Sequence, residues 1–333
     1  MRRIFQNSIA LMVVVIVLFL IVPLHPALLD ILIITNISLS IVILMVTMTI
    51  SEALEFSIFP SLLLITTLFR LGLNVSTTRA ILGFDGSGAG ASPGTPVIQI
   101  FGQLITQGNI VLGIIIFFII VLVQFIVITK GAERVAEVAA RFTLDAMPGK
   151  QMAIDADLSS GLINEQQARE RRSKIQREAD FYGAMDGATK IVKGDATMSL
   201  IITAINLIGG IIIGSINGLG DLGTVAQTYS IATIGDGLVS QLPALMISTA
   251  TGMIVTRSVS EGSLNSDVIE QFARQPRAIL TAGAVLIILG IIPGTPTAPL
   301  LVVVGRLARY GDLMSGRLAR QTAEDVVQPE APA

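Results

Sequence analysis

The chain of 333 residues contains no cysteine and no tryptophan, and it has one histidine, His25. The missing cysteine excludes disulfide bonds, iron–sulfur clusters, cysteine-ligated zinc and thiolate catalysis. Charged residues make up only 14% of the chain, against roughly 25% in an ordinary soluble domain. A net charge of -2 supplies no overall basic field for nucleic acid. We therefore expect neither a soluble globular protein nor an enzyme, and no resident cofactor.

Hydrophobic residues form 52% of the sequence, and they gather in runs long enough to cross a bilayer. A spanning helix needs about 20 largely apolar residues. Eight runs meet this condition, at residues 7–25, 28–50, 58–80, 109–129, 197–218, 230–256, 277–293 and 297–313. The sequence therefore predicts an all-α, polytopic membrane protein with about eight transmembrane helices.

The basic residues predict the orientation, because short loops rich in Lys and Arg stay in the cytoplasm. Of the 22 Lys and Arg residues, 20 fall on the side of the N-terminus, and the exceptions are Arg70 and Arg79 in the third run. The loops 81–108 and 215–229 on the opposite side contain no basic residue. Both termini are therefore predicted to be cytoplasmic. The Gly/Ser/Pro-rich segment from Gly83 to Thr95 is interpreted as a flexible outer connector.

The predicted spans divide the chain into four parts. Residues 1–129 hold four spans and residues 197–315 hold the other four. Between them, residues 130–196 form a cytoplasmic insert with 11 basic and 11 acidic residues. Residues 316–333 are polar and resemble the start of a linker, so we expect a further cytoplasmic domain to follow. Gly149-Lys150 is no nucleotide-binding loop, because Leu144 stands where that motif requires glycine.

Several blocks of sequence in and around the insert match one known family. Residues 139–152 read AARFTLDAMPGKQM, which resembles the signature of the FHIPEP family, the large export-gate membrane proteins of flagellar and injectisome type III secretion. Further blocks resemble that family in the same order, FRLGLNVSTTR at 69–79, FYGAMDG at 181–187 and KGDA at 193–196. Ala146 and Ala156 favour the flagellar branch.

The resemblance implies a multi-pass protein of the bacterial inner membrane that forms a homo-oligomeric ring of nine subunits. Its implied partners are other export-gate membrane proteins and, through the further cytoplasmic domain, export substrates and chaperones. Arg134, Arg141 and Asp145 match positions that the family keeps charged and that are associated with proton-coupled export. A local salt bridge would explain these three charges equally well.

Ionisable groups inside a span cost at least about 2.5 kcal/mol each to insert, so they mark ion pathways or buried ion pairs. The groups that qualify are Asp195, Asp236, Lys190, Arg79 and Arg70. Asp236 is expected a few residues inside the outer end of its span, between two glycines that let backbone or water approach. Asp195 is expected at a helix N-terminus, whose dipole favours a carboxylate, with Lys190 nearby. A static pair with a basic residue is the alternative, above all for Arg70.

The sequence therefore predicts a component that couples proton entry to the passage of unfolded export substrates, with protons as the coupling ion. Three alternatives remain open. The first is the injectisome gate of the same family, the second a proton-coupled transporter of small solutes, and the third a ring scaffold that conducts nothing. A transporter would be expected to show internal repeats with paired broken helices, and the sequence has no convincing similarity between its halves.

Overall fold

The computed structural model describes residues 8–86, 92–257, 271, 275–290, 299, 301–306 and 308–309. Within these ranges every regular element is a helix, in agreement with the predicted all-α class. The contacts divide the chain into two units, residues 1–259 and 260–333. The second unit contains the helix α11 (Pro276–Gly290).

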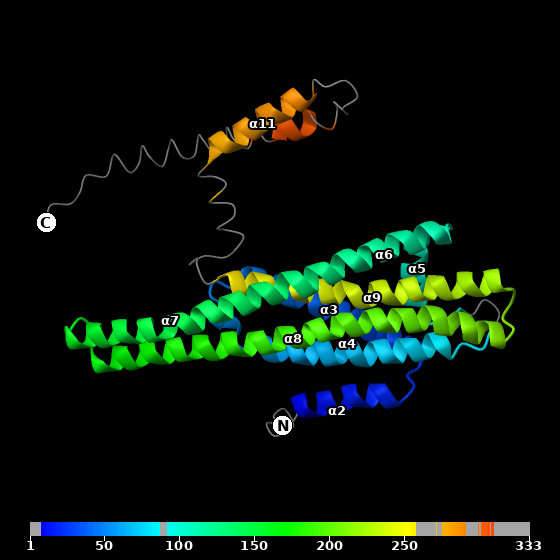
Figure 1. Cartoon of the computed structure of the whole chain (residues 1–333), viewed down its shortest axis with the longest axis horizontal. Helices are drawn as coiled ribbons and strands as arrows, with labels where there is room; N and C mark the ends of the chain where they lie inside the picture. The colour runs from blue at the N-terminus through cyan, green and yellow to red at the C-terminus, as the bar shows by residue number, and fades with distance from the viewer. Residues whose placement is uncertain are drawn as a thin grey trace. The chain divides into compact units, whose positions relative to one another are not determined.

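The first unit carries the long helices (Figure 1). In chain order its elements are α2 (Ser8–Ile21), α3 (Pro26–Thr49), η1 (Ala53–Phe56), α4 (Phe59–Leu82), α5 (Pro96–Thr106), α6 (Ile110–Ile126), η2 (Val127–Ala132), α7 (Glu133–Ser159), α8 (Glu165–Ile216) and α9 (Leu222–Thr256). The element η1 is a 3-10 helix, and η2 is a π-helix that joins α6 to α7 without a break.

Polar side chains cap the starts of these helices, as unpaired backbone N–H groups require. The Nδ1 atom of His25 accepts from the N–H of Ala27 at 3.4 Å, ahead of Pro26 at the first position of α3. Asn164 and Gln167 bond each other's backbone N–H in a reciprocal capping box at the start of α8. Side chains cap three further helices, namely Thr95 for α5, Asn109 for α6 and Asp221 for α9.

Four described helices are long and apolar enough to cross a membrane: α3, α4, α8 and α9. The pair α5 and α6 makes a fifth span if its 100° bend is counted as a break within one span. The predicted number of about eight is not confirmed. The first and seventh predicted spans correspond to α2 and α11, whose 14 and 15 residues are short of about 20. Of the 17 residues of the predicted run 297–313, eight lie outside the described residues.

The charged insert is continuous with the spans on both sides. On one side α6 passes through η2 into α7, and on the other side α8 extends over 52 residues across the predicted boundary at residue 196. The helices α7 and the first half of α8 lie side by side as a hairpin at one end of the bundle (Figure 1). The domain boundaries at 129 and 196 therefore fall inside helices, and the division of the chain stays a prediction.

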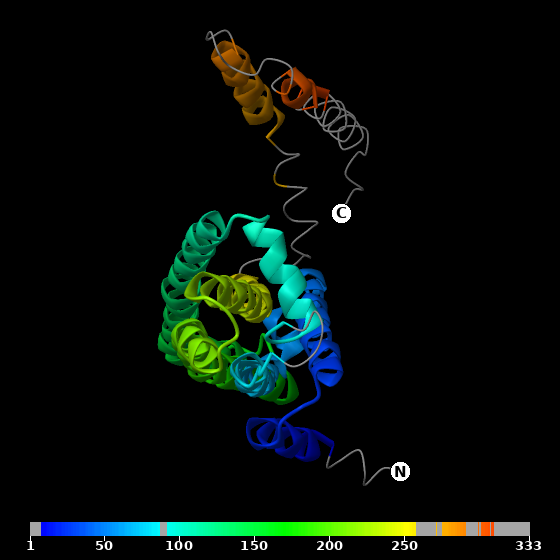
Figure 2. The ribbon, with the colours of Figure 1, turned by 90° about the vertical axis from the view of Figure 1, so that its right-hand side faces the viewer.

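The helix α9 occupies the centre of the first unit. Viewed along the bundle, it is surrounded by α3, α4, α5, α6 and α8, all of which pack against it (Figure 2). Many of its hydroxyl-bearing residues are buried, among them Ser230, Thr233, Ser248 and Thr251, whereas Thr249 and Thr256 are exposed. A helix in this position can hold polar side chains away from lipid.

The helix α5 lies within residues 81–108, which the sequence analysis described as a loop, and it begins directly after the predicted connector from Gly83 to Thr95. Thr95 caps the helix, and the N–H of Val97 also donates to the Asp30 carboxylate of α3 at 3.3 Å. The turn from α5 into α6 contains Gly108 at φ 83, in the left-handed region that favours glycine. With only 11 residues, α5 is too short to give a signal in a search for spans.

Candidate functional site

Three of the spanning helices turn polar faces toward one another. On α4 and α8 the polar residues are three, four or seven apart, and on α9 Asp236 and Ser240 are four apart, spacings that place side chains on one face. We call this set of residues the polar column: Arg70, Asn74 and Thr77 of α4, Asp195, Ser199 and Asn206 of α8, and Asp236, Ser240 and Gln241 of α9. Most of these side chains are buried although they lie in apolar helices.

At one level of the column, Arg70 forms an ion pair with Asp195. Each side chain is 2% exposed, so neither charge has a solvent alternative to the other. Two guanidinium nitrogens of Arg70 and Oδ1 of Asp195 have no hydrogen-bond partner among the described residues. Removing either partner from such a pair leaves an uncompensated buried charge.

The surroundings of Asp195 differ from the sequence prediction. Asp195 lies 30 residues beyond the first residue of α8, so the expected effect of a helix N-terminus is wrong. Lys190 donates instead to Asp186, at 2.8 Å on the outside of the helix. Arg70 has an acidic partner in Asp195, as the alternative of a buried ion pair requires. The role of the pair stays a prediction.

A small polar cavity of about 30 Å³ lies next to this pair, which exceeds the roughly 10–15 Å³ that a cavity needs to hold one water molecule. Its polar lining comes from Asn74, Gln124, Asp195, Ser199, Ser240 and Gln241. The hydroxyls of Ser199 and Ser240 are 3.4 Å apart, and the Gln124 side chain donates to the backbone carbonyl of Gln241. The cavity therefore extends the polar environment of Asp195 along the column.

At the next level, Asp236 lies among neutral polar side chains. The Nδ2 atom of Asn206 donates to Oδ2 of Asp236 at 2.9 Å, whereas the nearby Thr77 hydroxyl donates to the backbone oxygen of Asn74 at 3.1 Å. The helix α9 begins at Leu222, eight residues before the predicted span. Asp236 is therefore about 21 Å from the helix start rather than a few residues inside it. Its carboxyl group has no basic partner among the described side chains.

The two glycines beside Asp236 allow neighbouring helices to cover it. A Cβ atom on Gly235 would lie 1.9 Å from the backbone oxygen of Ile98 in α5. A Cβ atom on Gly237 would lie 2.5 Å from the ring of Phe117 in α6. The expected close approach of backbone is therefore present, and it serves the packing of α5.

Arg79 is separate from the polar column. Its guanidinium donates to the backbone oxygens of Leu20 and Ile21, at 2.9 and 3.1 Å. These carbonyls are among the unpaired groups at the C-terminus of α2, so Arg79 caps that helix. Arg70 and Arg79 have different partners, as their separation by nine residues predicts.

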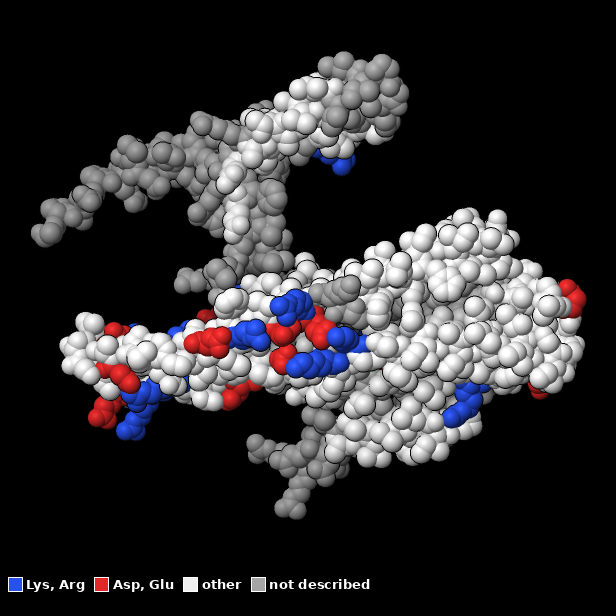
Figure 3. Space-filling model, viewed as in Figure 1, with Lys and Arg blue, Asp and Glu red and all other residues white. Residues whose placement is uncertain are grey.

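The charges of the insert lie on the surface. In Figure 3 charged side chains gather over α7 and the first half of α8, whereas the surface over α6 shows almost none. Arg134 pairs with Glu137 at 2.7 Å, and both Arg141 and Asp145 are exposed. The described residues show no ion pair between Arg141 and Asp145, and the functional role of this network stays a prediction. The helices α7 and α8 are joined by ion pairs such as Lys150 with Glu178 and Lys193 with Glu133, both at 2.9 Å.

Several polar residues that the sequence analysis did not select belong to the same interior. They include Asn74, Thr77, Gln124, Ser199, Asn206 and Ser240. A search restricted to charged residues finds none of them. Uncharged amides and hydroxyls within an apolar run, at helical spacing from a charged residue, are the signal that would have found them.

A bundle of apolar helices that encloses Arg70, Asp195 and Asp236 defines a membrane protein with an ionisable interior, the class in which such groups mark ion or substrate pathways. The comparison with known families identifies the particular group. The chain belongs to the FHIPEP family, whose family model matches residues 16–332.

Curated relatives agree with this assignment. The chain is 52% identical over 328 residues to the flagellar biosynthesis protein FlhA of Bacillus subtilis, covering 97% of this chain and 47% of that protein. It is 49% identical to the FlhA protein of Caulobacter vibrioides, covering 98% of this chain and 45% of that protein. It is 47% identical to the low calcium response locus protein D of Yersinia pestis, with 93% and 44% covered. The chain thus spans about half the length of these relatives. No solved structure matched the chain.

Proposed function

We propose that this chain is the membrane part of an export-gate component of a type III secretion apparatus, in the flagellar branch, which couples the proton motive force to the translocation of unfolded protein substrates. The observation that carries the proposal is the buried pair of Arg70 and Asp195, in a column that also holds Asp236. Family membership and the printed names of the relatives support the secretion context. The chain itself catalyses no reaction and uses no cofactor beyond protons.

The coupling step is the protonation of Asp195. A proton that crosses the membrane releases about 2.3 kcal/mol per 100 mV. Once its carboxylate is neutral, Asp195 no longer offsets the charge of Arg70, so the attraction between α4 and α8 weakens. Because α8 continues into the charged hairpin, this change reaches the surface that carries Arg134, Arg141 and Asp145.

The assembly belongs to the same proposal. The protein forms a homo-oligomeric ring of nine subunits in the bacterial inner membrane, with both termini in the cytoplasm. It contacts other export-gate membrane proteins, and a further cytoplasmic domain receives export substrates and chaperones. Nucleic acid is not a partner. The flagellar branch is preferred over the injectisome branch because several of the matching relatives are named as flagellar biosynthesis proteins.

A ring scaffold that conducts no protons is the second candidate. The observation that favours it is the same ion pair, because a permanent bond between Arg70 and Asp195 would lock α4 to α8. A transporter of small solutes receives less support. It requires matching broken helices in two halves, whereas the described part of the chain has one bent pair, α5 and α6.

The experiment separates the pair's structural role from proton transfer. Asp195→Asn is expected to assemble but to abolish export, and Asp195→Glu is expected to retain partial export. The double variant Arg70→Gln/Asp195→Asn removes both charges, so we expect it to recover stability without recovering export. Export is measured in cells, and proton flux is measured with the protein in vesicles.

Normal export by Asp195→Asn, or recovery of export in the double variant, would show that Asp195 acts as a structural partner. The assignment of the proton acceptor would then move to Asp236. Absence of proton flux through the unaltered protein would support the scaffold.

A further inference from the structure

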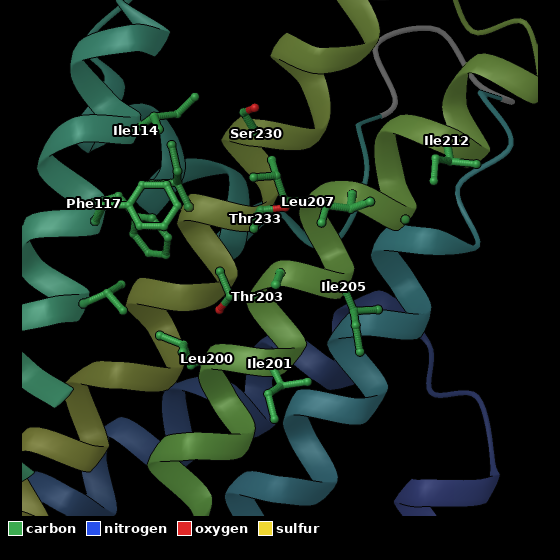
Figure 4. Close-up of a pocket in the computed structure, with 16 residues that line it drawn as sticks. Ile114, Phe117, Leu200, Ile201, Thr203, Ile205, Leu207, Ile212, Ser230 and Thr233 are labelled. Atoms are coloured by element: carbon green, nitrogen blue, oxygen red, sulfur yellow. The ribbon is translucent and has the colours of Figure 1, made fainter. Parts of the chain in front are cut away.

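A second, larger cavity of about 700 Å³ opens between α6 and α8, with α9 as its floor. Figure 4 shows Phe117 projecting from α6 on one side, Leu207 from α8 on the other, and Thr233 of α9 between them. The lining is aliphatic and aromatic apart from the hydroxyls of Thr203, Ser230 and Thr233. We call this cavity the apolar groove.

The mouth of the apolar groove faces the medium that surrounds the spanning helices. Phe118, Ile208 and Ile212 line the groove and are 54%, 61% and 54% exposed. No charged residue takes part in the lining within the described part of the chain. For helices that cross a bilayer, the molecules available to such a mouth are lipid chains or apolar helices.

The length of the groove matches one leaflet of a bilayer. Its lining on α8 extends from Leu200 to Ile212, about 18 Å along the helix axis. The hydrocarbon core of a bilayer is about 30 Å thick, so one leaflet contributes about 15 Å. The groove is therefore about as long as an extended acyl chain within one leaflet.

The side chains of the groove do not suit another helix. Helices in membranes associate through small residues at intervals of four, which allow the backbones to approach. This chain uses such residues for its internal contacts, since Gly210 and Gly214 both pack against the Tyr229 ring. The small residues among the described lining are Thr203, Ala204, Gly209, Ser230 and Thr233, and no two of them on one helix are four apart. The bulky branched surface suits a flexible chain better than a helix.

We propose that the apolar groove binds an acyl chain of a phospholipid from the surrounding bilayer. Bound there, the chain lies against the side chains that separate the bilayer from the polar column. Val121 and Leu200 line both the groove and the small polar cavity next to Asp195. Phe117, also in the lining, covers Gly237 beside Asp236. The proposal does not depend on whether protons move through the column.

The absence of native tryptophan makes a fluorescence test direct. Phe118→Trp places a reporter in the groove, and Ile119→Trp places one at the next position of α6, which is 56% exposed but outside the lining. A phospholipid with brominated acyl chains, which quench tryptophan, is titrated into each purified variant in detergent. We expect quenching of Phe118→Trp to saturate near one lipid per chain, and quenching of Ile119→Trp to rise without saturation.

A second change fills the groove. Ala204→Phe, added to Phe118→Trp, should raise the lipid concentration needed for half-quenching at least tenfold, while Ala204→Leu should have an intermediate effect. Helical circular dichroism verifies that each variant is folded. The proposal is overturned if both reporters respond without saturation, or if Ala204→Phe leaves the titration unchanged. It is also overturned if the Phe118→Trp reporter is shielded from lipid by a second copy, which cross-linking between chains would reveal.

Discussion

Arg70 and Asp195 show how two opposite charges can both be buried in the interior of this protein when they pair with each other. Each side chain would be costly to bury alone, and each is 2% exposed because the other is present. The two residues are far apart in the sequence, so their contact joins α4 to α8 directly. Asp236 differs, because its hydrogen-bond partner Asn206 is neutral.

Removing one member of the pair is expected to destabilise the protein more than removing both. Asp195→Asn and Arg70→Gln should each lower stability by about 3–5 kcal/mol, because an unpaired charge stays buried. The double variant should lose less than either single variant, which thermal unfolding in detergent measures. Lys190→Gln is the control, since its pair with Asp186 faces outward, and its unfolding midpoint should not change. Additive effects in the double variant would contradict a direct interaction.

Gly235 is expected to tolerate no side chain. The methyl group of Gly235→Ala would lie 1.9 Å from the oxygen of Ile98, so α5 must move away from α9. Overpacking of this kind costs typically about 1–3 kcal/mol, which a lower unfolding midpoint will show. Gly252→Ala lies in the same helix but its methyl group meets no atom within 4 Å, so this control should unfold at an unchanged or higher temperature. Equal midpoints for the two variants would refute the close crossing.

Among the elements, α2 depends on contacts with α4 at its end. Arg79 donates to two of its terminal carbonyls, and the Ser76 hydroxyl donates to the backbone oxygen of Phe19 at 2.9 Å. The helix has 14 residues, and many of its apolar side chains are exposed. These polar contacts therefore fix the place where α2 ends.

Loss of the Arg79 cap should loosen α2 without unfolding the bundle. We expect Arg79→Ala to increase hydrogen exchange of the α2 backbone about tenfold, which corresponds to about 1.4 kcal/mol. Arg169→Ala is the control, because its pair with Glu165 is exposed at the far end of α8. Unchanged exchange in Arg79→Ala would mean that packing alone holds α2 in place.

The start of α8 should respond to its capping box. Asn164→Ala removes the acceptor for the N–H of Gln167, and we expect a loss of about 1 kcal/mol, confined to the first turns of the helix. Hydrogen exchange of residues 165–170 will measure this fraying. Asn164→Asp supplies an equally good cap and should exchange like the unaltered protein. Fraying that extends as far as Asp195 would contradict an effect confined to the first turns of α8.

On the scale of the whole molecule, the sequence predicts the features that depend on residues close together in the chain, such as the position of an apolar helix. The apolar runs at 28–50 and 58–80 correspond closely to α3 and α4. The first run lies between Pro26 and Ser51, and the second lies between Ser57 and Gly83. The start of α9 was placed eight residues late, since Gly, Thr and Gln dilute the hydropathy of its first turns. The pairing of Arg70 with Asp195 could not be predicted, because periodicity gives the face of a helix but not the neighbour it meets.

The orientation in the membrane is a property of the whole molecule that can be measured directly. We expect a single cysteine at Ser92 to react with a reagent outside the cell and a single cysteine at Ser173 to react only from the cytoplasm. The chain has no native cysteine, so the unaltered protein serves as the blank. Reversed accessibility of the two positions would show that the distribution of basic residues does not set the topology.

The unbroken length of α8 has a mechanical consequence. Asp195 and Lys174 lie on the same helix, and they bind Arg70 and Glu52, which belong to α4 and to the segment before η1. A rotation of α8 about its own axis by about 20° would move a side-chain tip at a radius of about 6 Å through about 2 Å. Such a twist loosens both ion pairs at once, although the two residues are about 32 Å apart along the axis. Torsion of one helix can therefore carry a signal between the polar column and the hairpin without any chain of intermediate contacts.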